Sequence, residues 1–382
     1  MIIRIVMMLA TVIGINGYIG WHVNVWLSHL MKASFQPVLF WVVYWILALS
    51  YLLAWLGSRI LHARVSRTLK IVGSYWFALI QFGVLLLPVT DIAAIVLYLA
   101  SVRSATYVPV LGWIDVVLLL VFLLIGSYFA RTPIVRKYEI TIPKRAGDWK
   151  QLRVAVASDI HLGVIVGNRH LRKLVQHVNE MKPDLILLPG DVIDDDIRPF
   201  IQGKMGLTLG QLQAPLGIYA VLGNHEYYGG HVPAFVEQME KIGIRVLMDE
   251  VVHLQERVYI VGRKDKTAEQ SAEGRKSLVS LLAGTDGTQP IIVMDHQPHQ
   301  LNKAVEAGAD VMLSGHTHRG QIAPNHLFTK RLFELDWGYL RKGNLHAIVS
   351  SGFGTWGPPI RLGSQSEIIE LIIHFTNERE EG

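Results

Sequence analysis

Long apolar runs dominate the first third of the chain. They cover about residues 5–21, 38–56, 71–100 and 108–130, and the second run contains no charged residue. A helix needs about 20 mainly apolar residues to cross a bilayer, and each run meets or approaches that length. The pattern therefore predicts an α-helical transmembrane region of about four spans over residues 1–130.

Two of these runs leave alternatives open. The first follows Arg4 and has the basic and apolar parts of a signal peptide, but no clear small-residue cleavage site, so we expect it to be retained. Pro88 and Asp91 interrupt the third run and could split it into two crossings. Asp91 and Asp115 are candidate functional carboxylates, because a charge inside a span is costly. Both lie near expected helix ends, where we favour a solvated position.

Basic residues are distributed unevenly among the segments that connect the runs. Lys and Arg accumulate in short cytoplasmic loops of membrane proteins. With four crossings, the bias predicts a cytoplasmic C-terminal domain, whereas a third run that crosses twice would make that domain extracytoplasmic. Two of the connections hold only Lys32 and Arg103. The connection after the second run and the segment after the fourth hold Arg59, Arg64, Arg67 and Lys70, and Arg131, Arg136, Lys137, Lys144, Arg145 and Lys150.

Beyond residue 150 the periodicity changes. Short apolar runs typical of buried strands alternate with helical patterns, and several runs end in a small polar cluster. The alternation predicts an α/β domain over residues 151–376 after a linker over residues 131–150, with a functional site at the carboxyl ends of the strands. The expected strands are 152–158, 184–188, 218–222, 291–294 and 311–313, and the expected helices are 169–181 and 234–242.

Composition narrows the chemistry of this domain. The mean hydropathy of +0.33 and the net charge of +5 average over an apolar membrane region and a charged remainder. A basic chain can bind nucleic acid, but basic residues that flank membrane spans explain the charge, so we do not expect a nucleic-acid partner. The chain contains no cysteine. Disulfides and thiolate ligands are therefore excluded, and any metal must be held by His, Asp, Glu or Asn.

Five clusters of candidate metal ligands follow apolar runs. Neutral imidazole suits Zn and Fe, and carboxylate and amide oxygens also accept Mn. A set of His, Asp and Asn without cysteine fits a dinuclear hydrolytic centre better than a structural zinc site. Each cluster alone is ambiguous, but five in succession predict a metal centre. The clusters are Asp159-Ile160-His161, Gly190-Asp191, Gly223-Asn224-His225-Glu226, Asp295-His296 and Gly315-His316-Thr317-His318.

The spacing within the clusters supports the same centre. Asp159 and His161 lie two residues apart, as do His316 and His318. Side chains two apart in an extended segment point to the same side, and such a pair on the loop after a strand can bind one metal. Three clusters begin with glycine, which permits a tight turn and keeps Cβ atoms away from a crowded site.

The order of these clusters resembles the calcineurin-like metallophosphoesterase superfamily. The segments SDIHLG, GNHE, DHQP, SGHTHRGQ and GTWGPPIRL are similar to its bacterial membrane-associated branch, which contains YkuE-like phosphodiesterases and UDP-diacylglucosamine pyrophosphatases. The resemblance covers about residues 150–375 and implies a four-layer α/β/β/α sandwich. It also implies two divalent metal ions, for which Mn, Fe and Zn all remain open.

The resemblance divides the ligands between the two metals. Two such cations would polarise phosphoryl oxygens and lower the pKa of a bridging water, and the hydroxide would attack phosphorus in line with the leaving oxygen. His225, not a ligand in this scheme, would stabilise the transition state or protonate the leaving group. Asp159, His161 and His318 would hold one metal, Asn224, His296 and His316 the second, and Asp191 would bridge the two.

Residues beside the clusters are expected to support or border the site. Glu226 is expected to orient a neighbouring group, and Asp295 to do the same or to be solvated. Relatives commonly carry glycine where this chain has Arg319, which could contact a substrate phosphate or point to solvent. The segment 352–359 is expected to form a rigid loop that borders the same pocket.

The segment 322–346 combines aromatic and basic residues, including Trp337 and Arg341. Such a segment suits a lipid headgroup or a membrane surface, and the alternative is a packed hairpin at the sandwich edge. We therefore expect a membrane-anchored phosphohydrolase that cleaves a phosphodiester or pyrophosphate bond, with lipid-linked molecules among the candidate substrates. The alternative is a membrane sensor or scaffold with a vestigial phosphoesterase domain. A transporter with a regulatory domain has little support, because no pair of discontinuous helices is evident.

Overall fold

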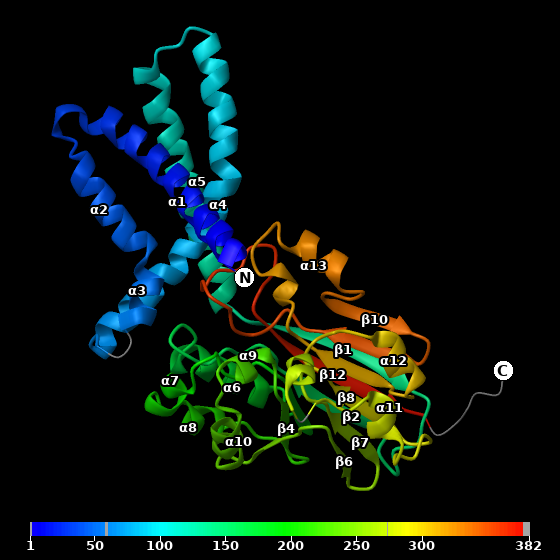
Figure 1. Cartoon of the computed structure of the whole chain (residues 1–382). Helices are drawn as coiled ribbons and strands as arrows, with labels where there is room; N and C mark the ends of the chain where they lie inside the picture. The colour runs from blue at the N-terminus through cyan, green and yellow to red at the C-terminus, as the bar shows by residue number, and fades with distance from the viewer. Residues whose placement is uncertain (1, 58–59, 273, 377–382) are drawn as a thin grey trace. The chain divides into compact units, whose positions relative to one another are not determined.

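The chain forms two compact units (Figure 1). The computed structural model describes residues 2–57, 60–272 and 274–376. The first unit runs to Ser127 and includes Gly357–Ile360, and the second comprises Tyr128–Trp356 and the chain from Arg361 onward. Arg59, one of the basic residues behind the topology prediction, lies outside the described residues.

Apolar helices make up the membrane unit (Figure 1). Three helices are long and apolar enough to cross a bilayer, and a bent helix pair would be a fourth span if it crosses as one. This confirms the predicted membrane region, with three to four candidate spans. The three long helices are α1 Ile2–Met31, α4 Ala63–Leu99 and α5 Ser104–Arg131, and the bent pair is α2 Pro37–Ala48 and α3 Ser50–Leu56.

The bent pair departs from the uniform second span expected over residues 38–56. The axes of α2 and α3 differ by 59°. No glycine or proline lies between Val38 and Leu56, but the Ser50 hydroxyl donates a hydrogen bond to the Leu47 carbonyl oxygen at 2.7 Å. Serine back-bonding of this kind competes with the helical ladder and bends helices. The second apolar run is therefore a broken or re-entrant element.

The third run forms one continuous helix. α4 extends through Pro88 and Asp91, although proline removes one helical hydrogen bond. Transmembrane helices tolerate such a proline when neighbouring groups satisfy the freed carbonyl. The basic residues Arg64, Arg67 and Lys70 lie in the first turns of α4 rather than in a loop.

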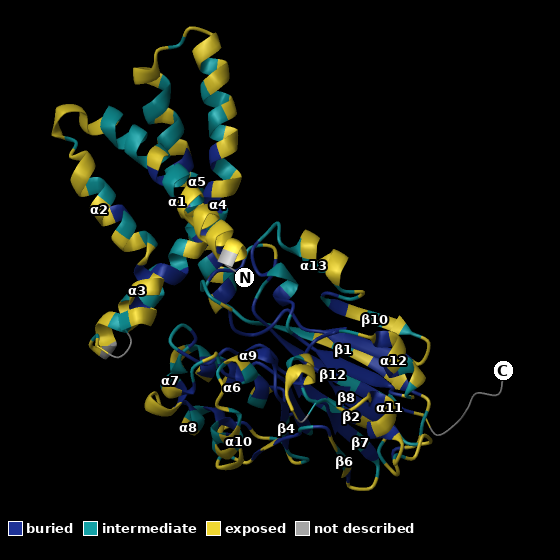
Figure 2. Ribbon diagram, in the orientation of Figure 1, coloured by how far each residue is buried: buried dark blue, intermediate teal, exposed yellow. Residues whose placement is uncertain are grey.

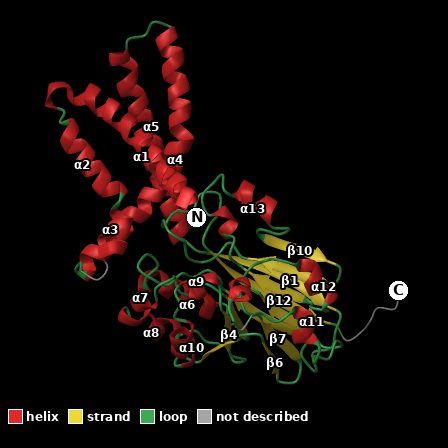
Figure 3. Ribbon diagram, viewed as in Figure 1, coloured by secondary structure: helices red, strands yellow, loops and turns green. Residues whose placement is uncertain are grey.

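Two six-stranded mixed sheets form the centre of the second unit (Figures 1 and 3). The first has the order β1-β12-β2-β3-β4-β5 and the second β10-β11-β9-β8-β7-β6. In the first sheet the strands are β1 Ile134–Ile142, β12 Glu367–Phe375, β2 Gln151–Val156, β3 Leu185–Pro189, β4 Ile218–Val221 and β5 Ile244–Val246. In the second they are β10 Gly338–Lys342, β11 Leu345–Val349, β9 Val311–Ser314, β8 Ile291–Met294, β7 Val258–Gly262 and β6 Glu250–Leu254.

Alternation of side chains along the strands builds the layers. Val154 and Val156 of β2 pack with residues of the other sheet such as Ile292, and Ala155 between them packs with the helices on the opposite face. A third core joins β8 and β9 to helices on the far side of the second sheet. The inner strands of both sheets are almost completely buried, whereas the edge strands β1, β6 and β10 are partly exposed (Figure 2). This order of helix, sheet, sheet and helix confirms the predicted four-layer α/β/β/α sandwich.

The helices of this unit are short. α6, α7 and α10 contribute to the core beside the first sheet, and α11 and α12 to the core beside the second. α13 follows a tight turn at the end of the ligand-bearing segment after β9. Their bounds are α6 Asn168–Glu180, α7 Ile197–Gln202, α8 Met205–Leu209, α9 Asn224–Tyr228, α10 Val232–Glu240, α11 Leu278–Leu282, α12 Leu301–Glu306 and α13 His326–Leu332.

The segment 131–150, for which the sequence predicts a linker, contains β1. Every residue of β1 pairs in parallel with β12. Ile140 and Ile142 turn into the core between the sheets, while Arg136 and Lys137 pair with the β12 carboxylates Glu367 and Glu370. The charged residues hide the apolar alternation that marks a strand. The remaining predicted strands and helices lie within two residues of their observed bounds, and the domain boundaries stay a prediction.

Candidate metal centre

Each predicted metal ligand lies just past the carboxyl end of a strand. Asp159 and His161 follow β2, Asp191 follows β3 and Asn224 follows β4, and these three strands are parallel neighbours in the first sheet. The remaining ligands, His296, His316 and His318, follow β8 and β9, which are parallel neighbours in the second sheet. Because the carboxyl ends of parallel strands meet at one edge, ligands far apart in the sequence converge.

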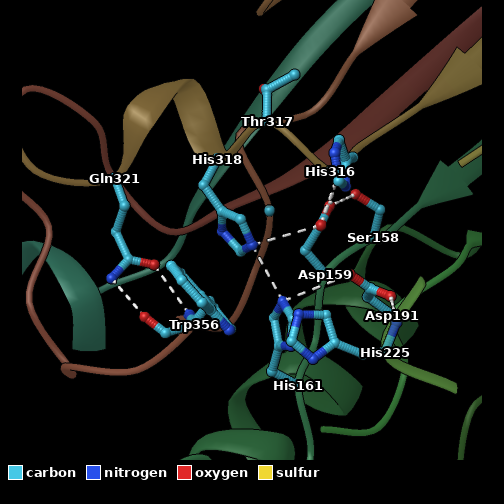
Figure 4. Close-up of polar contacts among 12 residues, drawn as sticks. Ser158, Asp159, His161, Asp191, His225, His316, Thr317, His318, Gln321 and Trp356 are labelled. Atoms are coloured by element: carbon cyan, nitrogen blue, oxygen red, sulfur yellow. Dashed lines mark hydrogen bonds and ion pairs between the residues drawn. The ribbon is translucent and has the colours of Figure 1, made fainter. Parts of the chain in front are cut away.

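The first predicted set converges around facing ring nitrogens (Figure 4). The Nε2 atoms of His161 and His318 lie 3.0 Å apart. His318 Nε2 also lies 3.5 Å from Asp159 Oδ1. One donor atom from each of these three residues falls within 4.8 Å of the others. Three buried donors at this spacing are compatible with a single ion, since each could move onto it by about 1 Å or less.

The second predicted set converges around the Asn224 side chain. Asn224 Oδ1 lies 2.8 Å from His316 Nδ1 and 3.2 Å from His296 Nε2. His296 Nδ1 lies 2.8 Å from the Pro189 carbonyl oxygen. A carbonyl partner on one ring nitrogen leaves the other nitrogen free to bind a metal. His296 is thus oriented with Nε2 toward Asn224.

Asp191 contacts both sets. Its Oδ2 atom lies 3.1 Å from His296 Nε2 and 3.8 Å from His161 Nε2. The other oxygen, Oδ1, accepts a hydrogen bond from the backbone N–H of His225 at 2.9 Å. One carboxylate therefore lies between a histidine of each set, and its second oxygen is fixed by the backbone.

The backbone at the centre is unusual. Asp159, His161, Asp191, His316 and His318 all have φ between 47° and 70°. A non-glycine residue with positive φ is uncommon, and clusters of such residues mark functional sites, where the surrounding structure holds the strain. The side chains of Asp159 and His161 do point toward one site, as predicted, but the predicted cause, an extended backbone, is wrong. Left-handed turns, not strand alternation, bring these pairs together.

Glycine at two positions permits the close approach. A Cβ atom at Gly223 would lie 2.1 Å from Asp191 Oδ1, and one at Gly315 would lie 2.0 Å from Asp159 Oδ2. Neither distance is compatible with a side chain. The prediction that glycine keeps Cβ atoms away from a crowded site is confirmed at these two positions.

His225 lies beside the centre and contacts two carboxylates that the sequence analysis missed. Its Nδ1 atom lies 2.7 Å from Asp195 Oδ1 and 3.4 Å from Asp194 Oδ1. Burial opposes protonation of the ring, but the adjacent carboxylates of Asp194 and Asp195 raise the pKa of His225 to about 11. The run Asp194-Asp195-Asp196 just after Asp191 was the available signal.

Two buried carboxylates, Glu226 and Asp295, lie beside the ligands in the sequence. The Glu226 carboxylate accepts hydrogen bonds from the backbone N–H groups of Asp191, Ile193 and Gly223, at 3.1, 3.0 and 2.7 Å. Glu226 therefore orients neighbouring groups. The buried Asp295 pairs with Arg263, at 3.1 Å, and with Arg275, and is not solvated.

A buried arginine, also missed from the sequence, contacts the first set. Arg361 is fully buried, and its Nη2 atom lies 3.2 Å from His318 Nδ1. The same nitrogen donates to the carbonyl oxygens of Gly352 and Gly354 at 3.0 and 2.6 Å. Arg361 thereby joins the His318 ring to the loop after β11. Its only sequence signal was the GPPIRL segment.

That loop borders the centre. The N–H groups of Phe353 and Gly354 donate to the carbonyl oxygens of Ser158 and Asp159 at 2.9 and 2.7 Å. Trp356 is 59% exposed, and its ring centroid lies 6.4 Å from that of His225 (Figure 4). Two hydrogen bonds to the Gln321 side chain, both 2.9 Å, fix the Trp356 backbone. An exposed aromatic ring is thus held beside the candidate catalytic histidine.

The segment 322–346 divides into a packed part and an exposed part. The Trp337 ring lies 4.0 Å from the Arg319 guanidinium and 4.7 Å from that of Arg136, and its N–H group donates to Glu367. Arg319 therefore stacks on Trp337 rather than pointing freely to solvent. β10 and β11 form the hairpin at the sheet edge. α13 presents three large exposed apolar side chains, Leu327, Phe328 and Leu332, and the Tyr339 ring of β10 is partly exposed as well.

Three of the four candidate histidine ligands have a charge state that suits metal ligation, whereas burial opposes protonation of the fourth, His296, but the Asp191 charge raises its pKa. Burial lowers the pKa of His161 and His318 and lowers that of His316 to about 4. These rings are therefore neutral near pH 7, as a metal-ligating imidazole must be. Burial opposes ionisation of Asp191, but the charge of His296 and the hydrogen bond with it keep the pKa of Asp191 well below its ordinary value.

Comparisons with known proteins agree with this geometry. Residues 152–320 match the family model described as calcineurin-like phosphoesterase. An uncharacterized metallophosphoesterase of Aquifex aeolicus is 31% identical over 251 residues, which cover 65% of this chain and 93% of that protein. A Danio rerio transmembrane protein with metallophosphoesterase domain is 30% identical over 275 residues, covering 69% of this chain and 62% of that protein. The uncharacterized metallophosphoesterase YkuE of Bacillus subtilis is 27% identical over 251 residues, covering 59% and 80%.

Several curated relatives extend beyond the matched part. The chain spans about 60% of the length of three of them.

Proposed function

This chain belongs to the calcineurin-like phosphoesterase family, and from that premise we propose that it hydrolyses a phosphodiester or pyrophosphate bond at a centre of two divalent metal ions. It is a membrane protein by its apolar helices and by its likeness to transmembrane relatives. The number of ions, the bond cleaved and the substrate are parts of the proposal.

The position of Asp191 is the observation that carries the proposal. Its Oδ2 atom lies within 4 Å of a ring nitrogen from each ligand set, as a bridging carboxylate requires. Bound divalent cations would supply Lewis acidity toward phosphoryl oxygens and toward a nucleophilic water. The proposed ligands are Asp159, His161 and His318 for one ion, Asn224, His296 and His316 for the other, and Asp191 for both.

We assign His225 as the proton donor or transition-state partner. Its Nδ1 atom faces Asp195 and Asp194, which hold a proton there and leave Nε2 for a bound phosphate. A protonated ring can stabilise the charge that develops on phosphoryl oxygens and can donate its Nε2 proton to the leaving oxygen. Asp194 and Asp195 orient the ring and keep it charged.

The alternative of a vestigial phosphoesterase domain has little support. All seven proposed ligands and His225 are present, and the backbone strain at five of the ligands persists. A domain without catalytic function would have no use for residues held in such costly conformations.

A lipid-linked substrate is the finer part of the proposal. Leu327, Phe328 and Leu332 are 56, 62 and 72% exposed on α13, and Lys330 and Arg331 accompany them. Apolar side chains together with basic ones suit the interface of an anionic bilayer. Replacing Leu327 and Phe328 with Ser should therefore lower turnover of vesicle-borne substrates while sparing a water-soluble diester.

A turnover screen of the purified full-length protein, loaded in turn with Mn, Fe and Zn, tests the proposed activity. It compares an aryl phosphodiester, a lipid-linked pyrophosphate and a phospholipid. Saturable turnover of at least one of them, lost on chelation, is expected. No turnover of any substrate with any metal by a folded protein would favour the sensor or scaffold.

We also propose that the phosphoesterase domain lies on the cytoplasmic side. With four crossings, the connections rich in Lys and Arg lie on the same side of the membrane as this domain, and such connections are typically cytoplasmic. The absence of cysteine makes single-cysteine labelling possible. An impermeant maleimide should label Arg103→Cys in intact cells and Lys241→Cys only after permeabilisation. The reverse pattern would contradict this orientation.

A further inference from the structure

The membrane unit contains a large cavity of its own. Its volume is about 830 Å³, and residues of α1, α2, α4 and α5 line it. Sites for organic ligands commonly occupy about 300–1,000 Å³ and are mainly apolar with a few placed polar groups. Most of the lining side chains are aliphatic or aromatic, among them Trp26, Phe40, Tyr44 and Tyr107. The cavity has the size and the lining of a site for an apolar molecule.

Acidic groups interrupt this apolar lining. Asp91 of α4 and Asp115 of α5 both line the cavity, as does His22 of α1. None of the described lining residues is Lys or Arg. Asp91 is partnered, because Tyr18 donates a hydrogen bond to its Oδ2 atom at 2.5 Å and His22 Nε2 lies 3.2 Å from its Oδ1 atom. At most one of the two carboxylates is therefore balanced by a side-chain cation.

Among the described residues, no side-chain cation forms an ion pair with Asp115. It is 9% exposed, and the Thr90 hydroxyl, 2.8 and 3.0 Å from its two oxygens, is its one hydrogen-bond partner among the described residues. No Lys, Arg or His lies within ion-pair distance of it in that same part of the chain. The sequence favoured a solvated position near a helix end, but Asp115 lies eleven residues into α5 and is buried. A buried acidic group in a membrane helix is costly and points to a function.

We propose that this cavity binds an amphiphile with an apolar chain and a positively charged amine head, which pairs with Asp115. The charge of the lining selects the head, because the cavity offers two carboxylates and no strong base. The aromatic rings favour the same choice, since an ammonium group is attracted to the face of Trp and Tyr. The volume argues against a simple inorganic cation, which needs only a few oxygen ligands at close range. This site does not depend on the phosphoesterase activity.

Equilibrium binding to the full-length protein in phosphatidylcholine nanodiscs tests the proposal. The probes are hexadecylamine, hexadecanol and hexadecanoate at neutral pH, with empty nanodiscs as background. They share one chain and differ only in the head group. Saturable binding of the amine, at least about tenfold tighter than that of the alcohol or the carboxylate, is expected because only the amine can pair with a buried charge.

Two variants separate the effect of the Asp115 charge from the effect of the cavity volume. Asp115→Asn keeps the shape and a hydrogen bond to Thr90, so it should weaken amine binding about tenfold and leave alcohol binding unchanged. Ala94→Trp fills the cavity and should weaken binding of all three probes. Ser74→Ala is the matched control, because the buried Ser74 hydroxyl bonds to the Lys70 carbonyl of its own helix and is not among the described residues that line the cavity.

Thermal unfolding of each variant separates a lost site from a lost fold. Asp115→Asn removes an unbalanced charge, so its unfolding temperature should not fall. Equal affinities for the three probes would overturn the proposal, as would amine binding that survives Asp115→Asn or Ala94→Trp in folded protein. Those outcomes would mean that bilayer chains fill the cavity and that Asp115 is protonated and structural.

Discussion

Buried carboxylates occur in both units of this chain, but their surroundings differ. In the metal centre, Asp191 lies beside two imidazoles and accepts a backbone hydrogen bond, and Asp159 accepts hydrogen bonds from the backbone N–H of His316 at 2.9 and 3.1 Å. In the membrane unit, the Thr90 hydroxyl is the one described partner of Asp115. The first arrangement is crowded with nitrogen and oxygen donors, and the second opens on an apolar cavity. Both leave negative charge for the cationic ligand that we propose, a metal ion in one case and an organic cation in the other.

The largest effect is expected at the shared carboxylate of the metal centre. Asp191→Ala should lower turnover on the order of a thousandfold or more, since it removes a contact to both ligand sets at once. Steady-state kinetics of metal-loaded protein would measure the loss. Glu237→Gln, on the exposed face of α10, is the matched control and should match the unaltered chain. Turnover within tenfold of that chain in a folded Asp191→Ala protein would contradict the assignment of Asp191.

A variant of His225 should show that its role in proton transfer is separate from metal binding. His225→Asn should lower kcat by about a hundredfold to ten-thousandfold while the bound metal stays constant, because His225 acts beside the ligands and not as one of them. Metal analysis of the same preparation distinguishes the two roles. If metal content and turnover fall together, His225 is a ligand, which its position within 4.8 Å of His161 and Asp191 donor atoms would permit.

Arg361 should matter for stability as well as for activity. Arg361→Met would leave the buried Gly354 carbonyl oxygen without its donor and would remove one of the two donors to that of Gly352, which keeps the Glu367 backbone N–H. The free energy of unfolding should fall by about 4 kcal/mol, as expected for buried groups that lose their partners. Denaturant unfolding in detergent measures this loss. Arg361→Lys restores a charge but not the fork of donors, so it should recover only part of it. An unchanged stability in Arg361→Met would show that the loop is held by other contacts.

Some of the residues that carry these predictions could be identified from the sequence, and others could not. The ligand clusters were visible because each follows an apolar strand, and the strands were visible because they are buried on both faces. Asp194, Asp195 and Arg361 were not, since their roles depend on loops whose conformation no local pattern indicates. β1 was missed because Arg136, Lys137 and Glu139 interrupt its alternation. In the membrane unit, the length of the apolar runs located the helices but gave no sign of the cavity, which exists only once the helices pack.

The smallest predicted effect is a pH dependence of stability that arises from His170, which packs against the loop that borders the centre. His170 stacks on Phe353 with ring centroids 4.3 Å apart, and burial lowers the pKa of His170 from 6.5 to about 4. The unfolded chain therefore binds this proton more readily, so the contribution is fully present above pH 6.5 and is lost as the pH falls through about 4. The shift corresponds to about 3 kcal/mol at most.

Unfolding of the full chain and of His170→Phe at neutral and acid pH measures that contribution. His170→Phe should reduce the loss of stability between about pH 6.5 and 4, since a phenyl ring keeps the stack but cannot bind a proton. Identical acid sensitivity in the two proteins would contradict the buried neutral state of His170.

Metal content measured together with turnover tests the central claim most directly. The purified full-length protein should bind two divalent ions per chain, lose turnover when a chelator removes them and regain it on reloading. Asp191→Ala, prepared in parallel, should retain fewer than two ions per chain. Undiminished turnover by metal-free protein would contradict the account, and so would a fully active protein that holds only one ion.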